Sequence, residues 1–497
     1  MFFLIEITTF IVILIISLWI FVKSKYNYWK DRQIPYIEPI FPTGTIHLKD
    51  KPLNNAFINQ LYYNKMKGKG PFCGIFFYIQ PAVLALELEF IKKVLIKDFK
   101  HFHDRGMYYN EKTDPITGHL FNLEGEKWKM LRSKISPSFS AGKIKQMFPS
   151  IVTIGDELVK ALNVTLQSDP EIEMKDFIAR YGTDVIGTCA FGLNCNSLAD
   201  PDAPFREMGR RIFGKPRNPR YLQIFLITFK EFGKLLGMKT LRDDVSQFVL
   251  DTIKETVEYR NLNQVERHDF MELLIKLKNN GEITLNELAA QCYVFYIGGF
   301  ETSSTTISYA LFELAQNEEL QNKVRAHINE IMARHNGILS YECLSDMTYV
   351  EQCIQESLRK YPPVPHLIRE VTQDYPVEHY NCVLKKGTLL HVPVYAIQHD
   401  PEYYPNPEEF NPDRFNSDET LKRDPITFIP FGEGPRICPG VRFGMIQSKL
   451  ALALLLKNFQ FKLSPKMKLP LTYVPGSVIL TTEGGLWLNL TSIKSQS

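Results

Sequence analysis

The sequence predicts a mainly α-helical protein with a smaller β part, built as a single large domain behind an N-terminal transmembrane anchor. Three observations support this class. An apolar run fills residues 3–22, a helical pattern continues for about thirty residues after Thr284, and only short runs favour strands. The 497 residues, 44% of them hydrophobic, can bury a large core. Length alone suggests roughly two or three domains, but neither a linker nor an internal repeat follows residue 50.

The overall charge excludes one class of partner. The formal net charge is +3, and basic residues alternate with acidic ones, so we expect no nucleic-acid binding. The eight cysteines show no paired spacing, which indicates a reducing compartment and not a disulfide framework. We therefore interpret most of them as small core residues.

Residues 3–22 are apolar apart from Glu6 and three hydroxyl residues, which is long enough to cross a bilayer. A cleaved signal peptide would need basic residues before this run and a small-residue cleavage site after it, and both are missing. An Arg-rich mitochondrial presequence is missing too. The basic residues follow the run instead, which predicts a cytosolic position for the rest of the chain. They are Lys23, Lys25, Lys30 and Arg32.

The next stretch predicts a stiff, non-helical hinge, because it contains Pro35, Pro39, Pro42 and Gly44. Residues 72–88 then predict a β-hairpin that is interrupted at Gln80-Pro81.

The pattern becomes mostly helical after Glu89. Trp128 and Arg132 lie four residues apart and share one face of a helix, where an indole N–H and a guanidinium suit an acidic group. Residues 210–239 mix eight basic residues with aromatic ones, a composition that suits a membrane surface. The alternative for this segment is an ordinary amphipathic helix pair.

Thr284-Leu-Asn-Glu287 is a capping box, and the helix that it opens should continue to about Ala315, roughly 45 Å. Inside this helix, Gly298 and Gly299 each oppose helix formation by about 1 kcal/mol. Two interpretations remain open. The glycines either let a ligand lie against the backbone, with Glu301 and Thr302 supplying a proton relay, or form a notch that packs another helix.

Farther along, Glu356 and Arg359 lie three residues apart on a helix that Pro362-Pro363 ends. Lys385-Lys386-Gly387 predicts a hairpin turn between residues 382–384 and 388–394, and residues 478–487 predict another.

The stretch Phe431–Gly440 sets Cys438 among three glycines and two prolines, directly before an apolar helical pattern. Such a loop lets a flat group approach closely, and its N–H groups can point at a thiolate. Arg436 can meet an anion beside the sulfur. An accessible thiolate is a metal ligand, and a single Cys ligand on haem iron favours O–O cleavage. The alternative is a structural Cys in a Gly-rich turn.

The pattern Phe431-x-x-Gly434-x-Arg436-x-Cys438-x-Gly440 resembles the haem-binding signature of cytochromes P450. The resemblance covers nearly the whole chain after the anchor. It implies the P450 fold and haem b (iron protoporphyrin IX) with Cys438 as the metal ligand. It also implies three segments: a transmembrane signal anchor at 1–22, a basic, proline-rich hinge at 23–50, and a haem-thiolate catalytic domain at 51–497.

The resemblance assigns roles to the other motifs. Glu301 and Thr302 match the catalytic acid–alcohol pair. Trp128, Arg132 and Arg369 match contacts to the haem propionates. Glu356, Arg359 and Arg414, the last in Pro412-Asp413-Arg414-Phe415, match a buried salt-bridge network that braces the Cys loop. The implied cofactor-binding residues are Trp128, Arg132, Gly298, Gly299, Arg369, Phe431, Arg436, Cys438 and Gly440. His399 receives no role, and we interpret it as a solvated or core histidine.

Phe102-His-Asp-Arg-Gly and Gly125-Glu-Lys-Trp-Lys-Met-Leu-Arg are similar to insect microsomal P450s of the sixth family, many of which oxidise plant toxins and insecticides. The implied protein is a monooxygenase of the endoplasmic reticulum membrane with its catalytic domain on the cytosolic side. The implied partners are NADPH–cytochrome P450 reductase, cytochrome b5 as a second candidate donor, a lipophilic small-molecule substrate and membrane lipid. We expect an acidic reductase to dock on a basic face made by Lys127, Lys129, Lys134, Lys143, Lys145, Arg436 and Arg442.

Two other functions remain open. One is an isomerase or dehydratase of the same fold that acts on peroxides without external electrons, although Glu301-Thr302 argues against it. The other is a non-catalytic haem-based ligand-binding protein, which the fold alone does not exclude.

Overall fold

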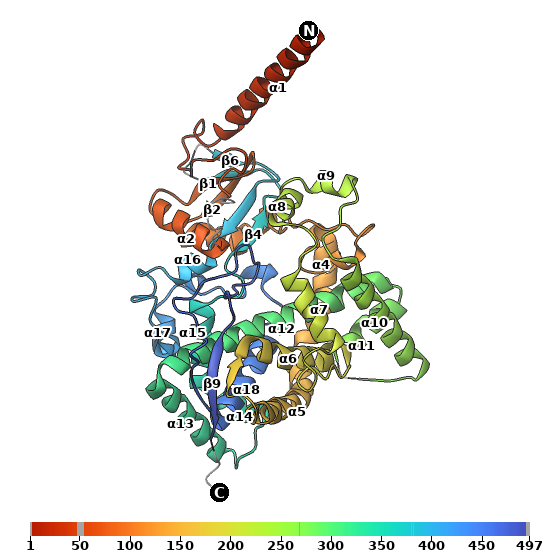
Figure 1. Ribbon diagram of the computed structural model, residues 1–497, viewed down its shortest axis with the longest axis vertical. Helices are drawn as coiled ribbons and strands as arrows, with labels where there is room; N and C mark the ends of the chain where they lie inside the picture. Colours follow the sequence, from red (N-terminus) through yellow and green to blue (C-terminus); the bar gives the residue numbers. More distant parts are fainter. Residues whose placement is uncertain (1, 47–53, 268, 379, 381, 494–497) are drawn as a thin grey trace.

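A computed structural model describes residues 2–46, 54–267, 269–378, 380 and 382–493. It confirms the predicted class, since helices predominate and three small sheets make up the β part (Figure 1). The helices are α1 (Phe2–Tyr26), α2 (Asn55–Met66), α3 (Leu88–Lys92), α4 (Gly125–Ile135), α5 (Ala141–Thr165), α6 (Met174–Ile186), α7 (Pro204–Gly214), α8 (Arg220–Thr228), α9 (Lys230–Leu235), α10 (Asp243–Leu262), α11 (Phe270–Asn279), α12 (Leu285–Gln316), α13 (Glu318–Arg334), α14 (Tyr341–Asp346), α15 (Thr348–Lys360), α16 (Val394–Gln398), α17 (Ser417–Leu421) and α18 (Val441–Asn458). The strands are β1 (Phe72–Phe77), β2 (Gln80–Ala85), β3 (Glu171–Glu173), β4 (Leu367–Glu370), β5 (Tyr375–Val377), β6 (Cys382–Leu384), β7 (Leu389–Val392), β8 (Phe459–Leu463) and β9 (Trp487–Ser492).

Helix α1 projects from one end of the body (Figure 1), and its residues from Ile5 onward are apolar and numerous enough to cross a membrane. It continues to Tyr26, past the predicted end of the anchor at residue 22. The following segment is non-helical as predicted, but it packs on the body. Trp29 is fully buried and its indole N–H donates to the Ile75 carbonyl at 3.2 Å. The predicted boundary at residues 50 and 51 lies outside the described residues.

The largest sheet has the strand order β1-β2-β7-β4. Its antiparallel β1–β2 pair confirms the hairpin predicted within residues 72–88, but the turn is at Tyr78-Ile79, because Gln80 and Pro81 already pair with β1. Strand β7 pairs with β2 on one side, in parallel, and with β4 on the other, where Arg369 faces Leu390. The hairpin predicted around Lys385–Gly387 is therefore wrong. Both edges of β7 are taken, so β6 pairs with β5 in a separate sheet.

The C-terminal hairpin predicted at residues 478–487 is also not a strand pair of its own. A single bridge joins Tyr473 to Thr482, and the chain then enters β9. Strand β9 lies between β3 and β8 in the third sheet, where it is antiparallel to both. This long connection brings residues 473–482 close to α12, because the Tyr309 hydroxyl donates to the Leu480 carbonyl at 3.4 Å.

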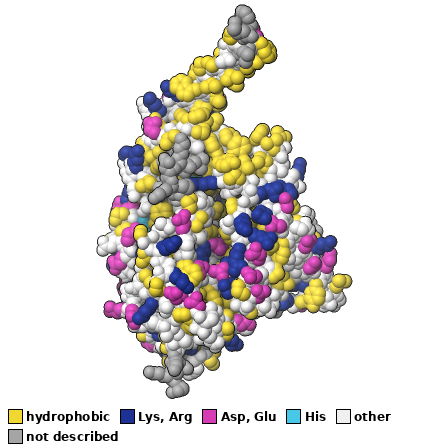
Figure 2. Space-filling view, in the orientation of Figure 1, with side chains coloured by type: hydrophobic (Ala, Val, Ile, Leu, Met, Phe, Trp, Pro, Cys, Tyr) yellow, Lys and Arg dark blue, Asp and Glu magenta, His cyan; other side chains and the backbone are white. Residues whose placement is uncertain are grey.

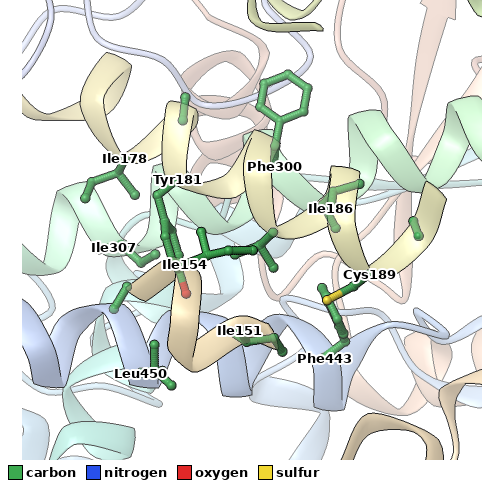
Figure 3. Packing of buried hydrophobic residues seen from close by; sticks show 14 of the residues in the cluster. Ile151, Ile154, Ile178, Tyr181, Ile186, Cys189, Phe300, Ile307, Phe443 and Leu450 are labelled. Carbon is green, nitrogen blue, oxygen red and sulfur yellow. The ribbon is translucent and has the colours of Figure 1, made fainter. Parts of the chain in front are cut away.

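Helix α12 crosses the middle of the molecule (Figure 1), and both bonds of its predicted capping box are present between Thr284 and Glu287. Figure 3 shows the apolar contact that fixes it, with Ile154 from α5, Tyr181 from α6, Ile307 from α12 and Leu450 from α18. Burial of such side chains contributes about 1.5–3 kcal/mol each. This core therefore fixes α12 against α18, the helix that follows the Cys438 loop.

Candidate active site

The loop before α18 has a backbone conformation that requires glycine at two positions. Gly432 and Gly434 have φ values of +78° and +72°, and a Cβ on Gly434 would overlap the Leu95 carbonyl oxygen. The Cys438 N–H closes the loop by donating to the Phe431 carbonyl at 3.0 Å. Cys438 remains partly accessible, whereas all seven other cysteines are buried. Its sulfur is therefore the one that the fold can present to a ligand.

Burial raises the pKa of the Cys438 thiol, while the Gly440 N–H, Arg132 and Arg105 lower it. A bound metal ion would remove this thiol proton, because coordination deprotonates a thiol. The described residues hold no cluster of three or more His, Cys, Asp or Glu side chains that could bind a metal by themselves. A single sulfur with an N–H donor beside it fits a metal whose other ligands belong to a cofactor, as in haem.

Four arginines form a cluster beside this sulfur: Arg105 and Arg132 act on the Cys438 thiol, and Arg369 and Arg436 act on Arg105. Burial lowers the pKa of Arg369 to about 10 and that of Arg436 to about 9. Nε of Arg369 and Nη1 of Arg436 are buried without a hydrogen-bond partner. Like charges at buried positions are costly unless an anion neutralises them, and of these four arginines only Arg436 forms a described ion pair, with Asp104 at 3.3 Å. The two propionate groups of haem have the right charge and hydrogen-bond acceptors for this cluster.

Arg105 was not among the predicted site residues. Burial and the neighbouring Arg369 and Arg436 hold its pKa well below the ordinary value. Its guanidinium donates to the carbonyls of Phe121 and Arg436 at 3.0 and 3.2 Å. The signal in the sequence is its place in Phe102-His-Asp-Arg-Gly, a stretch that carries part of the family resemblance.

The predicted Trp128 and Arg132 lie on α4, and the structure adds a third partner. The Arg436 guanidinium stacks over the Trp128 ring at 4.0 Å. It is fixed there by the carbonyls of His103 and Leu123, at 2.6 and 2.8 Å. Arg436 is thus an internal residue and does not belong to the predicted basic docking face.

The two glycines of α12 have different roles. A Cβ on Gly298 would meet open space, whereas a Cβ on Gly299 would overlap the side chain of Ile186 on α6. The helix-packing interpretation therefore applies to Gly299, and the ligand interpretation stays a prediction for Gly298. Gly298 leaves room beside the helix, and Gly299 lets α6 approach, so its place is in the helix contact and not on the predicted cofactor surface.

Thr302 lies one turn after Gly298, and its hydroxyl donates to the Gly298 carbonyl at 2.6 Å. Glu301 is buried and forms an ion pair of 2.7 Å with Lys175, at the start of α6. The Lys175 ammonium also donates to Thr481 at 2.9 Å. The predicted acid is thus held by a cation that the sequence did not reveal, and it makes no described hydrogen bond to the Thr302 hydroxyl.

The predicted salt-bridge network is assembled. Arg359 donates to both Glu356 oxygens at 2.7 and 2.9 Å, and both side chains are fully buried. Arg414 lies 3.5 Å from Glu356. Arg359 also donates to the Gln398 and Pro407 carbonyls at 2.9 and 2.8 Å. The network therefore joins α15 to the segment that precedes the Cys loop.

His399 is a core histidine. Its ring stacks on Tyr395 at 3.9 Å, and its Nδ1 lies 2.8 Å from the Tyr395 carbonyl. Burial lowers its pKa to about 3, so the ring is neutral at physiological pH.

Comparison with known proteins agrees with this geometry. A family model described as Cytochrome P450 matches residues 39–489. The chain is 43% identical to "Probable cytochrome P450 6a20" of Drosophila melanogaster over 484 residues, which cover 95% of this chain and 97% of that protein. It is 44% identical to "Cytochrome P450 6A1" of Musca domestica over 487 residues, 96% of each chain.

Proposed function

This chain belongs to the cytochrome P450 family, and on that premise we propose that it is a membrane-anchored monooxygenase of lipophilic foreign compounds, such as plant toxins or insecticides, with electrons from NADPH through a reductase. Family membership makes the chain a P450 monooxygenase with a haem cofactor. The observation that carries the proposal is the partly accessible Cys438 beside four arginines. The substrate class rests on the likeness to insect P450s of the sixth family.

Each residue of the site would have a separate task. Haem b, when bound, would supply the iron that activates O2. Cys438 would be its protein ligand, and Arg105, Arg132, Arg369 and Arg436 would neutralise the propionates. Gly298 leaves space beside α12 for substrate and oxygen. Thr302 would orient the proton donor, and Glu301, restrained by Lys175, would resupply it.

Thr302→Ala tests this relay. We expect near-normal haem and substrate binding and continued NADPH oxidation, but less product per NADPH and more hydrogen peroxide, because the hydroxyl that orients the donor is gone. General acid–base groups contribute about 10² to 10⁴ in rate, and water can replace part of a lost hydroxyl. The matched control is Thr305→Ala, whose hydroxyl also donates to a carbonyl one turn earlier but is fully buried. Unchanged coupling in Thr302→Ala would assign the residue to helix packing.

The proposed reductase face is smaller than the sequence suggested, because three of its lysines are already neutralised. Lys127 pairs with Glu111 and Glu287, Lys134 with Glu282, and Lys145 with Glu342. Lys129 is 71% exposed and only loosely paired, at 3.6 Å from Glu126. Lys143 and Arg442 are exposed and form no described ion pair. We therefore assign docking of an acidic donor to Lys129, Lys143 and Arg442.

Reversing Lys129 and Lys143 to Glu is expected to slow reduction by the reductase roughly tenfold at low ionic strength, with the difference shrinking as salt rises. Substrate binding should not change, since both residues are on the outer surface. Stopped-flow reduction measures the effect. The control is Lys254→Glu/Lys457→Glu, which makes the same charge change at exposed positions of α10 and α18. Equal rates for the two double variants at low salt would rule out this docking face.

An apolar surface at the end of the body from which α1 projects supports attachment to the endoplasmic reticulum membrane. Figure 2 shows hydrophobic side chains gathered there, and the exposed ones on or beside α8 and α9 are Tyr221, Phe232, Leu235 and Leu236. Six of the eight basic residues in 210–239 pair with protein carboxylates, so apolar side chains dominate this second contact. Lys23 and Lys25 at the end of α1 support a cytosolic body.

A further inference from the structure

Lys230, the first residue of α9, lies between two carboxylates from distant parts of the chain. Its ammonium donates to Glu124 at 2.9 Å and to Glu370 at 2.5 Å. The three side chains are only 19%, 21% and 13% exposed. This is a partly buried ion triad, and it joins three separate elements.

The two carboxylates adjoin the arginine cluster of the haem site. Glu124 directly precedes α4, which carries Trp128 and Arg132. Glu370 directly follows Arg369 on β4. The Lys230 ammonium therefore connects α9, at the apolar end of the molecule, to α4, which carries Arg132, and to β4, which carries Arg369 (Figure 1).

The charges depend on one another. Burial raises the pKa of Glu124, Lys230 opposes this, and Glu370 adds to it. Burial disfavours the charged form of Lys230, but the two carboxylates more than offset this and its pKa is raised. Without Lys230, two like charges would remain together away from water, which costs far more than losing an exposed ion pair.

Other contacts of α9 and of the residues after it include hydrogen bonds to residues 104–118 and the Lys234 ammonium over the Tyr109 ring at 5.2 Å. The Tyr108 hydroxyl donates to the Met238 carbonyl at 2.6 Å. Asp114 accepts from the N–H groups of Thr240 and Leu241 at 2.9 and 3.0 Å. Water can replace such bonds when the elements separate, so each of them resists separation less than a buried ion pair does. The Lys230 triad is the ion-paired contact that joins α9 to α4 and β4.

We propose that Lys230 is a positioning residue that latches the cover formed by α8 and α9 onto α4 and β4, and that this latch opens when a large ligand enters or leaves. The inference rests on the proposed haem site, because the ligand route is defined by Cys438 and its arginines. The latch holds the cover closed, and it also fixes the ends of the two elements that bear Arg132 and Arg369.

The test uses full-length, haem-loaded protein in phospholipid nanodiscs and two probes that bind haem iron through a ring nitrogen, imidazole and clotrimazole. Lys230→Met is expected to accelerate both association and dissociation of the bulky clotrimazole, on the order of tenfold, since truncating one member of a buried charge pair acts mainly on dissociation. Imidazole rates should stay unchanged because this small probe does not need the cover to open. Stopped-flow absorbance in the Soret region reads both.

Three variants make the result specific. Lys234→Met on the same helix removes an ion pair with the exposed Glu231 and a contact with the Tyr109 ring, but no contact to α4 or β4, and should change neither probe. Lys230→Arg should restore slow clotrimazole exchange. Lys230→Met/Glu124→Gln/Glu370→Gln removes all three charges and should also restore it, because no unpaired carboxylate then drives opening.

Hydrogen exchange gives a readout that does not depend on haem. Amides of residues 230–241 should exchange faster in Lys230→Met and not in Lys234→Met. The latch is refuted if Lys230→Met leaves both clotrimazole kinetics and this exchange unchanged, or if it changes both probes equally. Absence of an imidazole response in the wild type would instead refute the proposed haem site, while hydrogen exchange would still decide on the latch.

Discussion

Cys438→Ala is expected to abolish the thiolate-type Soret band of the ferrous carbonyl complex. The other seven cysteines are all buried elsewhere in the fold, so none can present its sulfur at this loop. Four arginines remain in the variant, so some haem can still bind without the sulfur. The effect on activity should be complete, because the ligand that favours O–O cleavage is lost.

The carbonyl difference spectrum of the purified variant measures this loss. Cys382→Ala, which removes a buried cysteine from β6, is the control and should keep the band. A thiolate-type band in Cys438→Ala would show that the ligand has been assigned to the wrong residue.

Glu356→Ala is expected to have the second largest effect. It leaves Arg359 buried with carbonyl partners but no counter-charge, and it removes the carboxylate near Arg414. Breaking a buried pair in this way costs about 3–5 kcal/mol, a large share of the free energy of unfolding of a typical protein. Because Glu356 also accepts from the Asn411 N–H at 2.9 Å, the segment leading to the Cys loop should loosen as well.

Thermal unfolding and the haem content of the purified protein measure this effect. Glu409→Ala is the control, since its exposed carboxylate lies 4.0 Å from Arg414 at the edge of the same network. If Glu356→Ala matched the wild type in both measurements, the network would have no bracing role.

Local signals predicted the local structure. The capping box at Thr284 and the β1–β2 hairpin were recognisable because their residues are neighbours in sequence. The turn at Lys385–Gly387 has an equally good local signal, but tertiary pairing overrides it. Strand β7 is already flanked by β2 and β4. A turn motif identifies where the chain reverses and does not identify which strands then pair.

The site was predictable to the extent that its residues form short motifs. Cys438, the Glu356–Arg359 pair and the acid–alcohol pair all belong to such motifs. Lys175 and Lys230 do not, because their partners lie far away in sequence and a lysine in an amphipathic segment carries no local mark of burial. The same cause explains the docking face, where Glu282, Glu287 and Glu342 neutralise lysines of distant segments.

The hinge shows a related limit. Its prolines correctly predicted a non-helical segment, but Trp29 turned out to be a core residue seated on β1. A single aromatic residue between a membrane anchor and a proline-rich stretch has no periodic pattern that would indicate burial.

The central claim is that this P450 inserts one atom of O2 with electrons from NADPH, and isotope incorporation tests it most directly. The protein would be reconstituted with reductase and lipid, supplied with the lipophilic compound that gives the largest spectral shift in a binding screen, and turned over under ¹⁸O₂. The account predicts an NADPH-dependent product that carries one ¹⁸O atom. An unlabelled product, or conversion of a hydroperoxide without reductase or NADPH, would contradict it and indicate an isomerase or dehydratase.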